Sequence, residues 1–272
     1  MSKSFTLIVC TYMRPNALLK LLESVHNQTV YPNDILIVDG STNGDTQKLL
    51  NDHPFKNLKY FKVDEKNRGL TKQRNFGISK VDGASEIVCF LDDDIVLTPT
   101  YFENLIGTYE THPMALAVGG YITNDVQWEK TDGLQDPSRF YYDGWMRPEP
   151  SRFKLRKKLG LNPNAPPGMM PDFSHGRPVS FLPPSGKIYK IEQLMGGTSS
   201  YRKKIFEELR FSTYFQGYGL YEDADFSLRL AKHGSVYLNT NAQLAHYHEA
   251  SEDLISTITE KWYYAMAGMF GK

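Results

Sequence analysis

The chain has 272 residues, of which 40% are hydrophobic and 23% are charged, as in a globular protein with one large domain or two fused halves. Lys+Arg and Asp+Glu both number 31. The resulting zero net charge argues against a nucleic-acid binder, because such proteins are usually basic. No stretch reaches the about 18 apolar residues of a membrane span, and no signal peptide is visible. The sequence therefore predicts a cytoplasmic protein, with peripheral contact at the inner face of the membrane left open.

Strands and helices alternate through the first half of the chain. Apolar runs predict strands at residues 5–10, 34–39, 58–63 and 86–91. Helical spacing of apolar residues predicts helices at residues 16–28, 46–51, 70–79 and 99–110. This alternation predicts an α/β fold with a Rossmann-like, mostly parallel central sheet flanked by helices. Ligands collect at the carboxyl ends of such strands, where residues 11–14, 39–41 and 92–94 supply polar side chains.

The second half is less regular. From about residue 125 to residue 190 no period persists, and Pro, Gly and aromatic residues dominate. We interpret this region as a long excursion that shapes a pocket, since it lacks the patterning of a separate domain. Regular patterning returns at Ile191 and predicts a helix at residues 222–233, a strand at 235–248 and a C-terminal helix at 254–270.

Three adjacent carboxylates, Asp92, Asp93 and Asp94, follow the fourth predicted strand. Burying unpaired anions is costly, and hard divalent cations prefer carboxylate oxygen ligands. In an extended segment Asp92 and Asp94 point to one side and Asp93 to the other. The pattern thus indicates a metal site, with an acidic, solvated turn as the alternative.

Two histidines near the end of the chain are candidates to complete that site. His246 and His248 alternate along the last predicted strand, so they share one face and lie roughly 7 Å apart. Only one of them is therefore expected to bind the ion, and the sequence leaves open which. Imidazole suits Mn²⁺-like ions better than Mg²⁺.

Polar residues of the first half suit a nucleotide. Asp39 ends a strand, where its carboxylate can accept hydrogen bonds from a nucleobase or ribose, or can simply form a turn before Gly40. Arg74 can bind a diphosphate with two nitrogens, unless it is an ordinary solvated helix arginine. Gly69 and Gly77 allow the backbone nearby to approach a ligand closely.

An acidic pair, Glu222 and Asp223, begins the helix predicted at residues 222–233. Negative charge is favourable there because of the helix dipole, which is the plainest explanation for both residues. Asp223 is also placed to act as a general base. Asp225 and Arg229 are four residues apart and are expected to pair with each other.

In this order along the chain, the segments resemble the family 2 glycosyltransferases, which have the GT-A fold. The resemblance runs from about residue 5 to residue 248, although the family commonly has two aspartates before the glycine at position 40, where this chain has one. It implies contacts with a nucleotide sugar from Thr11, Tyr12, Arg14, Asp39, Asn67, Arg74, Asp92 and Asp93. It implies a divalent metal, Mn²⁺ or Mg²⁺, held by Asp94 with Asp92 or His246. It implies that the donor sugar and the acceptor lie over a loop that begins with Gly196, Gly197 and Thr198, with Glu222 beside them. It also implies that Asp223 is the catalytic base.

The resemblance implies transfer of a sugar, with inversion, from a nucleoside-diphosphate sugar to an acceptor hydroxyl. UDP is the first expectation for the donor, with dTDP and GDP as alternatives, and the acceptor is expected to be a glycan or a lipid-linked molecule in polysaccharide or cell-surface glycan synthesis. Within one continuous domain, residues 1–120 would bind the nucleotide sugar. Residues 121–272 would bind the acceptor and carry the long insertion.

Two other functions are weighed against this one. A nucleotidyltransferase that makes a nucleotide sugar usually begins with a glycine-rich basic loop, which residues 11–15 do not form. An inactive sugar- or lipid-binding module would be expected to lack a carboxylate, yet Asp39, Asp94 and Asp223 are all present.

Two further segments are candidates for peripheral contacts. Residues 152–158 carry five basic side chains with apolar residues between them. They suit an anionic membrane surface or a lipid-linked diphosphate, and equally a solvated loop. The aromatic residues at 262–270 suit contact with a membrane, a partner subunit or the protein's own core.

Overall fold

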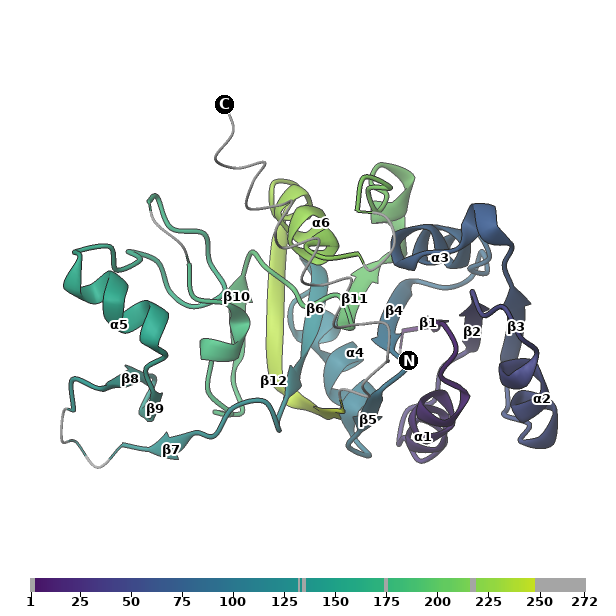
Figure 1. Ribbon diagram of the computed structural model, residues 1–272, viewed down its shortest axis with the longest axis horizontal. Helices are drawn as coiled ribbons and strands as arrows, with labels where there is room; N and C mark the ends of the chain where they lie inside the picture. The colour runs from purple at the N-terminus through teal and green to yellow at the C-terminus, as the bar shows by residue number, and fades with distance from the viewer. Residues whose placement is uncertain (1–2, 132, 134–135, 174–175, 216–218, 248–272) are drawn as a thin grey trace.

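A computed structural model describes residues 3–247, except 132, 134–135, 174–175 and 216–218. A central sheet of nine strands has the order β10-β12-β6-β11-β4-β1-β2-β3, with β5 paired to β12 (Figure 1). The helix predicted at residues 254–270 and the histidine at position 248 lie outside the described residues. Within the described part of the chain, no helix combines the length and apolar character needed to cross a bilayer.

The elements predicted for the first half are confirmed, with ends shifted by one or two residues. They are β1 (Phe5–Thr11), α1 (Pro15–His26), β2 (Asp34–Asp39), α2 (Asp45–Asp52), β3 (Leu58–Lys62), α3 (Leu70–Ile78), β4 (Ile87–Asp92) and α4 (Tyr101–Thr111). Strands β1 to β4 are mutually parallel. Their apolar runs follow from this position, because a parallel strand covered by helices is buried on both faces.

The central sheet is completed by β5 (Ile95–Leu97), which lies between β4 and α4 along the chain, and by β6 (Ala115–Ile122), β10 (Ile188–Ile191), β11 (Thr198–Arg202) and β12 (Ser235–His246). Helix α6 (Glu222–Ala231) precedes β12. Strand β11 lies between β4 and β6 and is antiparallel to both. The pairings therefore give β1–β4, β6 and β12 one direction and β5, β10 and β11 the other, which confirms the mostly parallel sheet.

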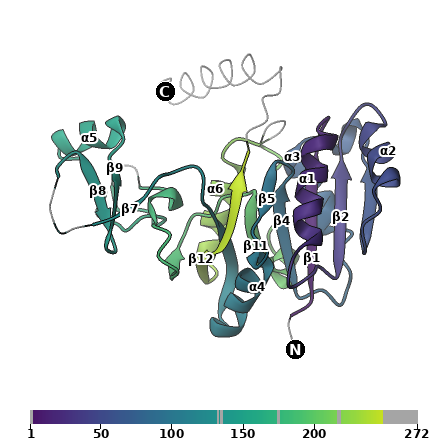
Figure 2. The ribbon, with the colours of Figure 1, turned by 90° about the horizontal axis from the view of Figure 1, so that it is seen from below.

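Helices cover both faces of the sheet and create two hydrophobic cores (Figure 2). On one face the apolar sides of α1 and α4 are buried, including the predicted stripe of α1 that contains Leu18, Leu21 and Val25. On the other face, α3 and α6 pack over a cluster of aromatic rings around Tyr201 and Phe226. The boundary expected between the two halves of the domain, at residue 120, falls inside strand β6, and the sheet continues through this strand.

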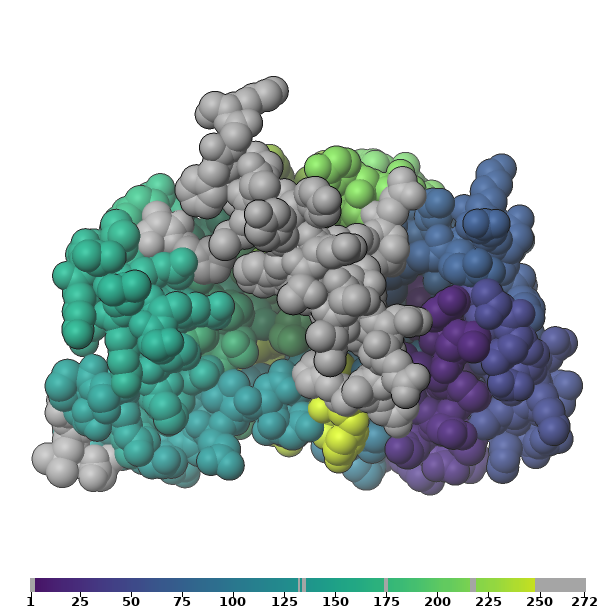
Figure 3. Space-filling view, in the orientation of Figure 1, coloured from purple at the N-terminus to yellow at the C-terminus, as the bar shows by residue number. Residues whose placement is uncertain are grey.

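The insertion, residues 125–190, contains more regular structure than we expected. It holds a small antiparallel sheet of β7 (Glu129–Lys130), β8 (Arg139–Tyr142) and β9 (Trp145–Pro148), the helix α5 (Ser151–Lys158) and a short 3-10 helix (Val179–Phe181). We did not predict these elements, because they pack through arginine–aromatic contacts and carry little apolar periodicity. The insertion forms one end of the molecule (Figure 3).

Candidate active site

The carboxyl end of β4 and the end of β12 bring together a possible metal site. One ligand atom each from Asp92, Asp94 and His246 can be chosen so that all lie within 4.8 Å of one another. His246 Nε2 is 3.1 Å from Asp94 Oδ1. The expected alternation along an extended segment was wrong, because Asp93 and Asp94 form a turn between β4 and β5 and both contact Arg14. Asp92 and Asp94 still join this cluster, whereas Asp93 accepts a hydrogen bond from Thr11.

These three residues fit a divalent cation. Two carboxylates and an imidazole form a donor set that suits Mn²⁺. Burial alone would raise the pKa of Asp94, but the hydrogen bond from His246 and the charge of Arg14 outweigh burial and lower it. The same hydrogen bond raises the pKa of His246. The carboxylate of Asp94 is thus kept ionised, which a metal ligand requires.

The second carboxylate of the motif, Asp93, ties β1 to β4. Thr11 Oγ1 donates a hydrogen bond of 2.7 Å to Asp93, and Arg14 places one guanidinium nitrogen 3.1 Å from Asp93 and the other 2.9 Å from Asp94. Burial raises the pKa of Asp93 to about 7. Thr11 and Asp93 are almost fully buried, so in this structure they bind each other, and their contacts with a nucleotide remain predictions.

Arg74 is buried under the cluster, which rules out the solvated alternative. Its guanidinium forms an ion pair with Glu222 and lies 3.4 Å from Asp92, over the rings of Phe90 and Phe211. Burial, opposed by the charge of Arg74, raises the pKa of Glu222 to about 7. The arginine therefore links the metal site to the start of α6, and its contact with a diphosphate remains a prediction.

Gly196 and Gly197 lie between the metal site and α6. The amide of Gly196 donates a 3.3 Å hydrogen bond to Asp223 Oδ2, and a Cβ at this position would be 2.5 Å from Glu222 Oε1. A Cβ at Gly197 would overlap the carboxylate of Asp92. Because neighbouring Cα atoms are about 3.8 Å apart, Asp92 and Asp223 flank the same short stretch of backbone.

The sequence relationships agree with this geometry. The model of the family described as Glycosyl transferase family 2 matches residues 6–173. This chain belongs to glycosyl transferase family 2. It is 30% identical over 139 residues to the glucosyl-dolichyl phosphate glucuronosyltransferase of Haloferax volcanii, an alignment that covers 50% of this chain and 43% of that protein. It is 29% identical over 115 residues to the O-antigen chain rhamnosyltransferase RfbN of Salmonella typhimurium, covering 42% of this chain and 36% of that protein.

A solved structure shows the fold of this family 2 chain. The crystal structure of GalNAc-T7 with UDP, GalNAc and Mn²⁺ superposes with a TM-score of 0.61 at 14% identity, covering 92% of this chain and 44% of that one. The likeness confirms the expected GT-A fold. The chain spans less than half the length of each of these relatives.

Asp223, the expected catalytic base, is the second residue of α6. Its side chain is half-buried, with Oδ1 accepting a hydrogen bond from the amide of Ala224 and Oδ2 accepting the one from Gly196. Two residues further on, Asp225 and Arg229 form the predicted pair at 2.6 Å.

The segments after β1, β2 and β3 carry the remaining predicted nucleotide contacts. Asp39 is fully buried, and its two oxygens accept hydrogen bonds from the amide of Ser41 and the hydroxyl of Tyr60, both 2.8 Å. Tyr12 is 47% exposed and is the most accessible of the predicted contacts in this region. Asn67 donates hydrogen bonds to Asp64 from both its amide and its side chain. The contacts of these loops with a nucleotide remain predictions.

Sequence reasoning missed two residues that hold these loops and misassigned one. The side-chain amide of Gln73 donates to the carbonyls of Thr11 and Val38, and Arg68 donates to the carbonyl of Gly40 at 2.7 Å. The only signal for them was their place between Asn67 and Gly77. Thr198 was expected in a loop, but it begins β11 and is buried against the carbonyl of Gly120.

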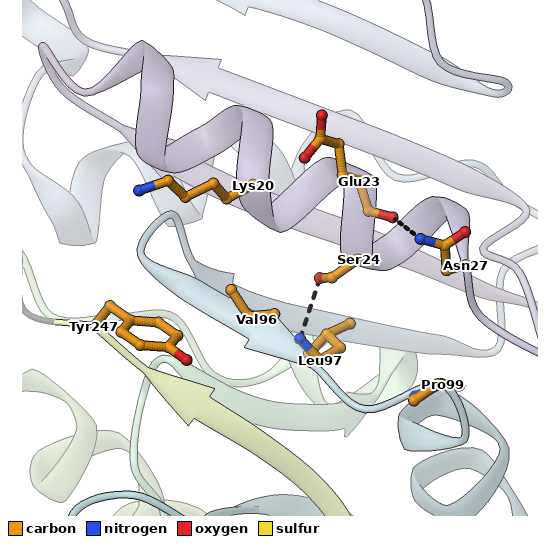
Figure 4. Close-up of a pocket in the computed structure, with 8 residues that line it drawn as sticks. All are labelled: Lys20, Glu23, Ser24, Asn27, Val96, Leu97, Pro99 and Tyr247. Atoms are coloured by element: carbon orange, nitrogen blue, oxygen red, sulfur yellow. Dashed lines mark hydrogen bonds between the residues drawn. The ribbon is translucent and has the colours of Figure 1, made fainter.

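A separate pocket of about 510 Å³ opens between α1 and β5 (Figure 4). None of the predicted site residues lines it. Its walls are the side chains of Lys20, Glu23, Ser24, Asn27, Val96, Leu97, Pro99 and Tyr247. The hydroxyl of Ser24 accepts a hydrogen bond from the amide of Leu97, which joins α1 to β5 at this pocket (Figure 4). We assign no role to this pocket.

Proposed function

We propose that this chain is a metal-dependent glycosyltransferase that moves a sugar from a nucleoside-diphosphate sugar to an acceptor hydroxyl. One observation carries the proposal. The ligand atoms of Asp92, Asp94 and His246 lie within 4.8 Å of one another, and Asp223 is held by the adjoining Gly196. A cation site for a diphosphate and a base for a hydroxyl thus meet at one edge of the sheet.

Asp92, Asp94 and His246 would hold Mn²⁺ or Mg²⁺. When bound, such an ion stabilises the negative charge of the departing diphosphate. The imidazole favours Mn²⁺ over Mg²⁺. The GalNAc-T7 crystal structure contains UDP and Mn²⁺, which supports UDP as the first candidate donor, with dTDP and GDP as alternatives.

Asp223 would take the proton of the acceptor hydroxyl during attack. A positioned carboxylate contributes typically 10²- to 10⁴-fold to such a step. The Gly196 amide orients this carboxylate, and the Arg74 ion pair fixes Glu222 beside it. With a base acting directly on the acceptor, the hydroxyl attacks from the face opposite the diphosphate, so the anomeric carbon is inverted.

The acceptor would be a glycan or lipid-linked molecule in polysaccharide or glycolipid synthesis. The two relatives described above support this, since one is a glucosyl-dolichyl phosphate glucuronosyltransferase and the other an O-antigen chain rhamnosyltransferase. In this proposal residues 1–120 bind the donor and residues 121–272 the acceptor, in the cytoplasm. The position of the insertion beside β6 and β12 suits an acceptor-side role.

The first test is thermal stabilisation by UDP, dTDP, GDP and CMP, each with and without Mn²⁺. A ligand that binds only the folded state raises stability with the logarithm of its concentration over its dissociation constant. We expect a metal-dependent rise for one nucleoside diphosphate. If no nucleotide changes the melting temperature, the inactive binding module becomes the better explanation. Release of pyrophosphate from a nucleoside triphosphate would instead indicate a nucleotidyltransferase.

A further inference from the structure

Helix α5 is a strongly basic element on the surface of the insertion. Within its eight residues it carries Arg152, Lys154, Arg156, Lys157 and Lys158. No acidic residue occurs between positions 150 and 171 of the sequence. Among the described residues, no lysine of α5 is within 4.0 Å of a carboxylate oxygen, although Lys154 is near enough to Asp136 to add to the hydrogen bonds from Ser138 in lowering the pKa of that carboxyl.

The same helix exposes large apolar side chains to solvent. Phe153 is fully buried and anchors α5 to the insertion. Leu155 and Leu159 are 59% and 63% exposed, and Leu161, just past the helix, is 45% exposed. At 3.6 residues per turn, Leu155 and Leu159 share a face that points roughly away from Phe153. The outward face of α5 thus mixes Leu155 and Leu159 with exposed polar side chains such as Arg152 and Lys158, and all three lysines of the helix are exposed to solvent.

Exposed leucines and lysines on one short basic helix suit contact with an anionic membrane surface. Apolar side chains enter the boundary between headgroups and acyl chains, and lysines along the helix contact lipid phosphates. Lysines near an anionic surface each strengthen binding by about fivefold. A solvated loop, the alternative weighed from the sequence, would not need two exposed leucines one helical turn apart.

We propose that α5 and the turn that follows it, residues 151–161, form a docking surface for an anionic lipid bilayer. This inference goes beyond the transfer reaction, since binding to a bilayer requires neither the metal site nor a sugar. The expected ligand is a bilayer and not a soluble phosphate, because the exposed leucines can insert between lipid headgroups but would gain no contact from a soluble phosphate.

The position of α5 is compatible with this role. The helix lies at the end of the molecule opposite α2 (Figure 1). In the view of Figure 2, α5 lies toward the edge of the sheet at which β1 and β12 end. Asp94 and His246 lie at the same edge. Docking through α5 would therefore hold the edge that bears the candidate active site near the bilayer surface.

The test is flotation of the full chain with vesicles of phosphatidylcholine alone or mixed with phosphatidylglycerol. We expect the chain to float only with the anionic vesicles. The triple variant K154E/K157E/K158E should lose at least tenfold in vesicle affinity. The matched control K48E/K56E/K204E makes the same change of net charge at three exposed lysines elsewhere and should retain binding.

A second pair of variants tests the leucines. L155S/L159S should weaken binding severalfold, whereas M114S/Y214S, which removes two strongly exposed apolar side chains elsewhere, should not. Failure to float, equal flotation with phosphatidylcholine alone, or equal losses in a variant and its control would each overturn the proposal. The nucleotide-induced thermal shift, measured on the same proteins, reports folding and the donor site separately from membrane binding.

Discussion

The carboxyl edge of the sheet and the insertion use charged residues in opposite ways. At the edge, Arg14 and Arg74 contact carboxylates that are held close together beside a possible metal site. In the insertion, Arg177 lies 4.6 Å from the centre of the Phe140 ring and 4.7 Å from that of Phe153, and it pairs with the carboxylate of Glu149. The edge of the sheet concentrates negative charge for a ligand. In the insertion, arginine side chains pack against aromatic rings.

This difference separates two kinds of sensitivity. Changes at Asp92 or Asp223 should alter chemistry while the fold persists, because the apolar cores on both faces of the sheet are buried independently of these two carboxylates. Changes in the insertion should alter stability, because its arginines replace the aliphatic core that a small sheet and one helix cannot provide. Arg147, over the ring of Phe181 at 4.3 Å, extends the same packing.

The largest effect is expected from replacing Asp223, the proposed catalytic base. Asp223→Asn should lower kcat by about 10²- to 10⁴-fold, because an amide cannot take the proton of the acceptor hydroxyl. Affinity for UDP in the presence of Mn²⁺ should stay near that of the unmodified protein. Steady-state kinetics and calorimetry check the two parts. Normal turnover with lost nucleotide affinity would contradict the assigned role.

In the insertion, Arg177→Leu should lower the free energy of unfolding by about 3–5 kcal/mol, because it leaves Glu149 buried without its partner. Urea denaturation measures this. The double variant R177L/E149L should be less destabilised than R177L alone, since the unpaired charge is gone. If the single and double variants unfold alike, the ion pair does not account for the effect.

At the edge, Gly197→Ala should lower kcat/KM by about 100-fold, because the added methyl group displaces the Asp92 carboxylate by about 1 Å. Mn²⁺ affinity should fall in parallel, as measured by titration. Gly107→Ala is the control, since no atom lies near a Cβ at that position of α4. Equal metal affinity in both variants would remove Asp92 from the ligand set.

The smallest effect is expected at the half-buried pair of Asp225 and Arg229 on α6. Asp225→Asn breaks the i, i+4 contact with Arg229 and should cost about 0.3–0.5 kcal/mol in stability, with kcat unchanged. It removes the same charge as Asp223→Asn from the same helix, so it isolates the role of position 223. If kcat fell as much as in Asp223→Asn, the effect would come from the total negative charge at the start of α6 and not from proton transfer to Asp223.

The sequence predicted strands β1 to β4 well and the antiparallel strand β11 poorly. The runs at β1, β2 and β4 are apolar because both faces are covered. Strand β11 is equally buried but reads Thr-Ser-Ser-Tyr-Arg, which has no apolar pattern. Its hydroxyls find main-chain partners, as when Ser200 donates to the carbonyl of Val118 at 2.8 Å. Only the tertiary structure provides those partners.

The residues of the candidate site also divide into some that could be predicted from the sequence and some that could not. The aspartates after β4 and the late histidine were predictable, because each follows a strand and carries a group that needs a cation. The hydroxyl of Tyr60 against Asp39 was not, since nothing local to either residue points to the other. Arg74 was predicted to face a ligand, and its burial against Glu222 depends on the path of the chain 148 residues later.

The place of β11 has a consequence for how the protein is made. This strand separates β4 from β6, yet on the order of 100 residues must be translated between β4 and β11. At about 5–20 residues per second, β4 emerges from the ribosome several seconds to tens of seconds before its neighbour. One edge of β4 can already pair with β1, but during that time the edge that faces β11 has no partner and is exposed to mispairing with other nascent chains. Productive folding thus requires the edge of β4 to remain unpaired until β11 arrives.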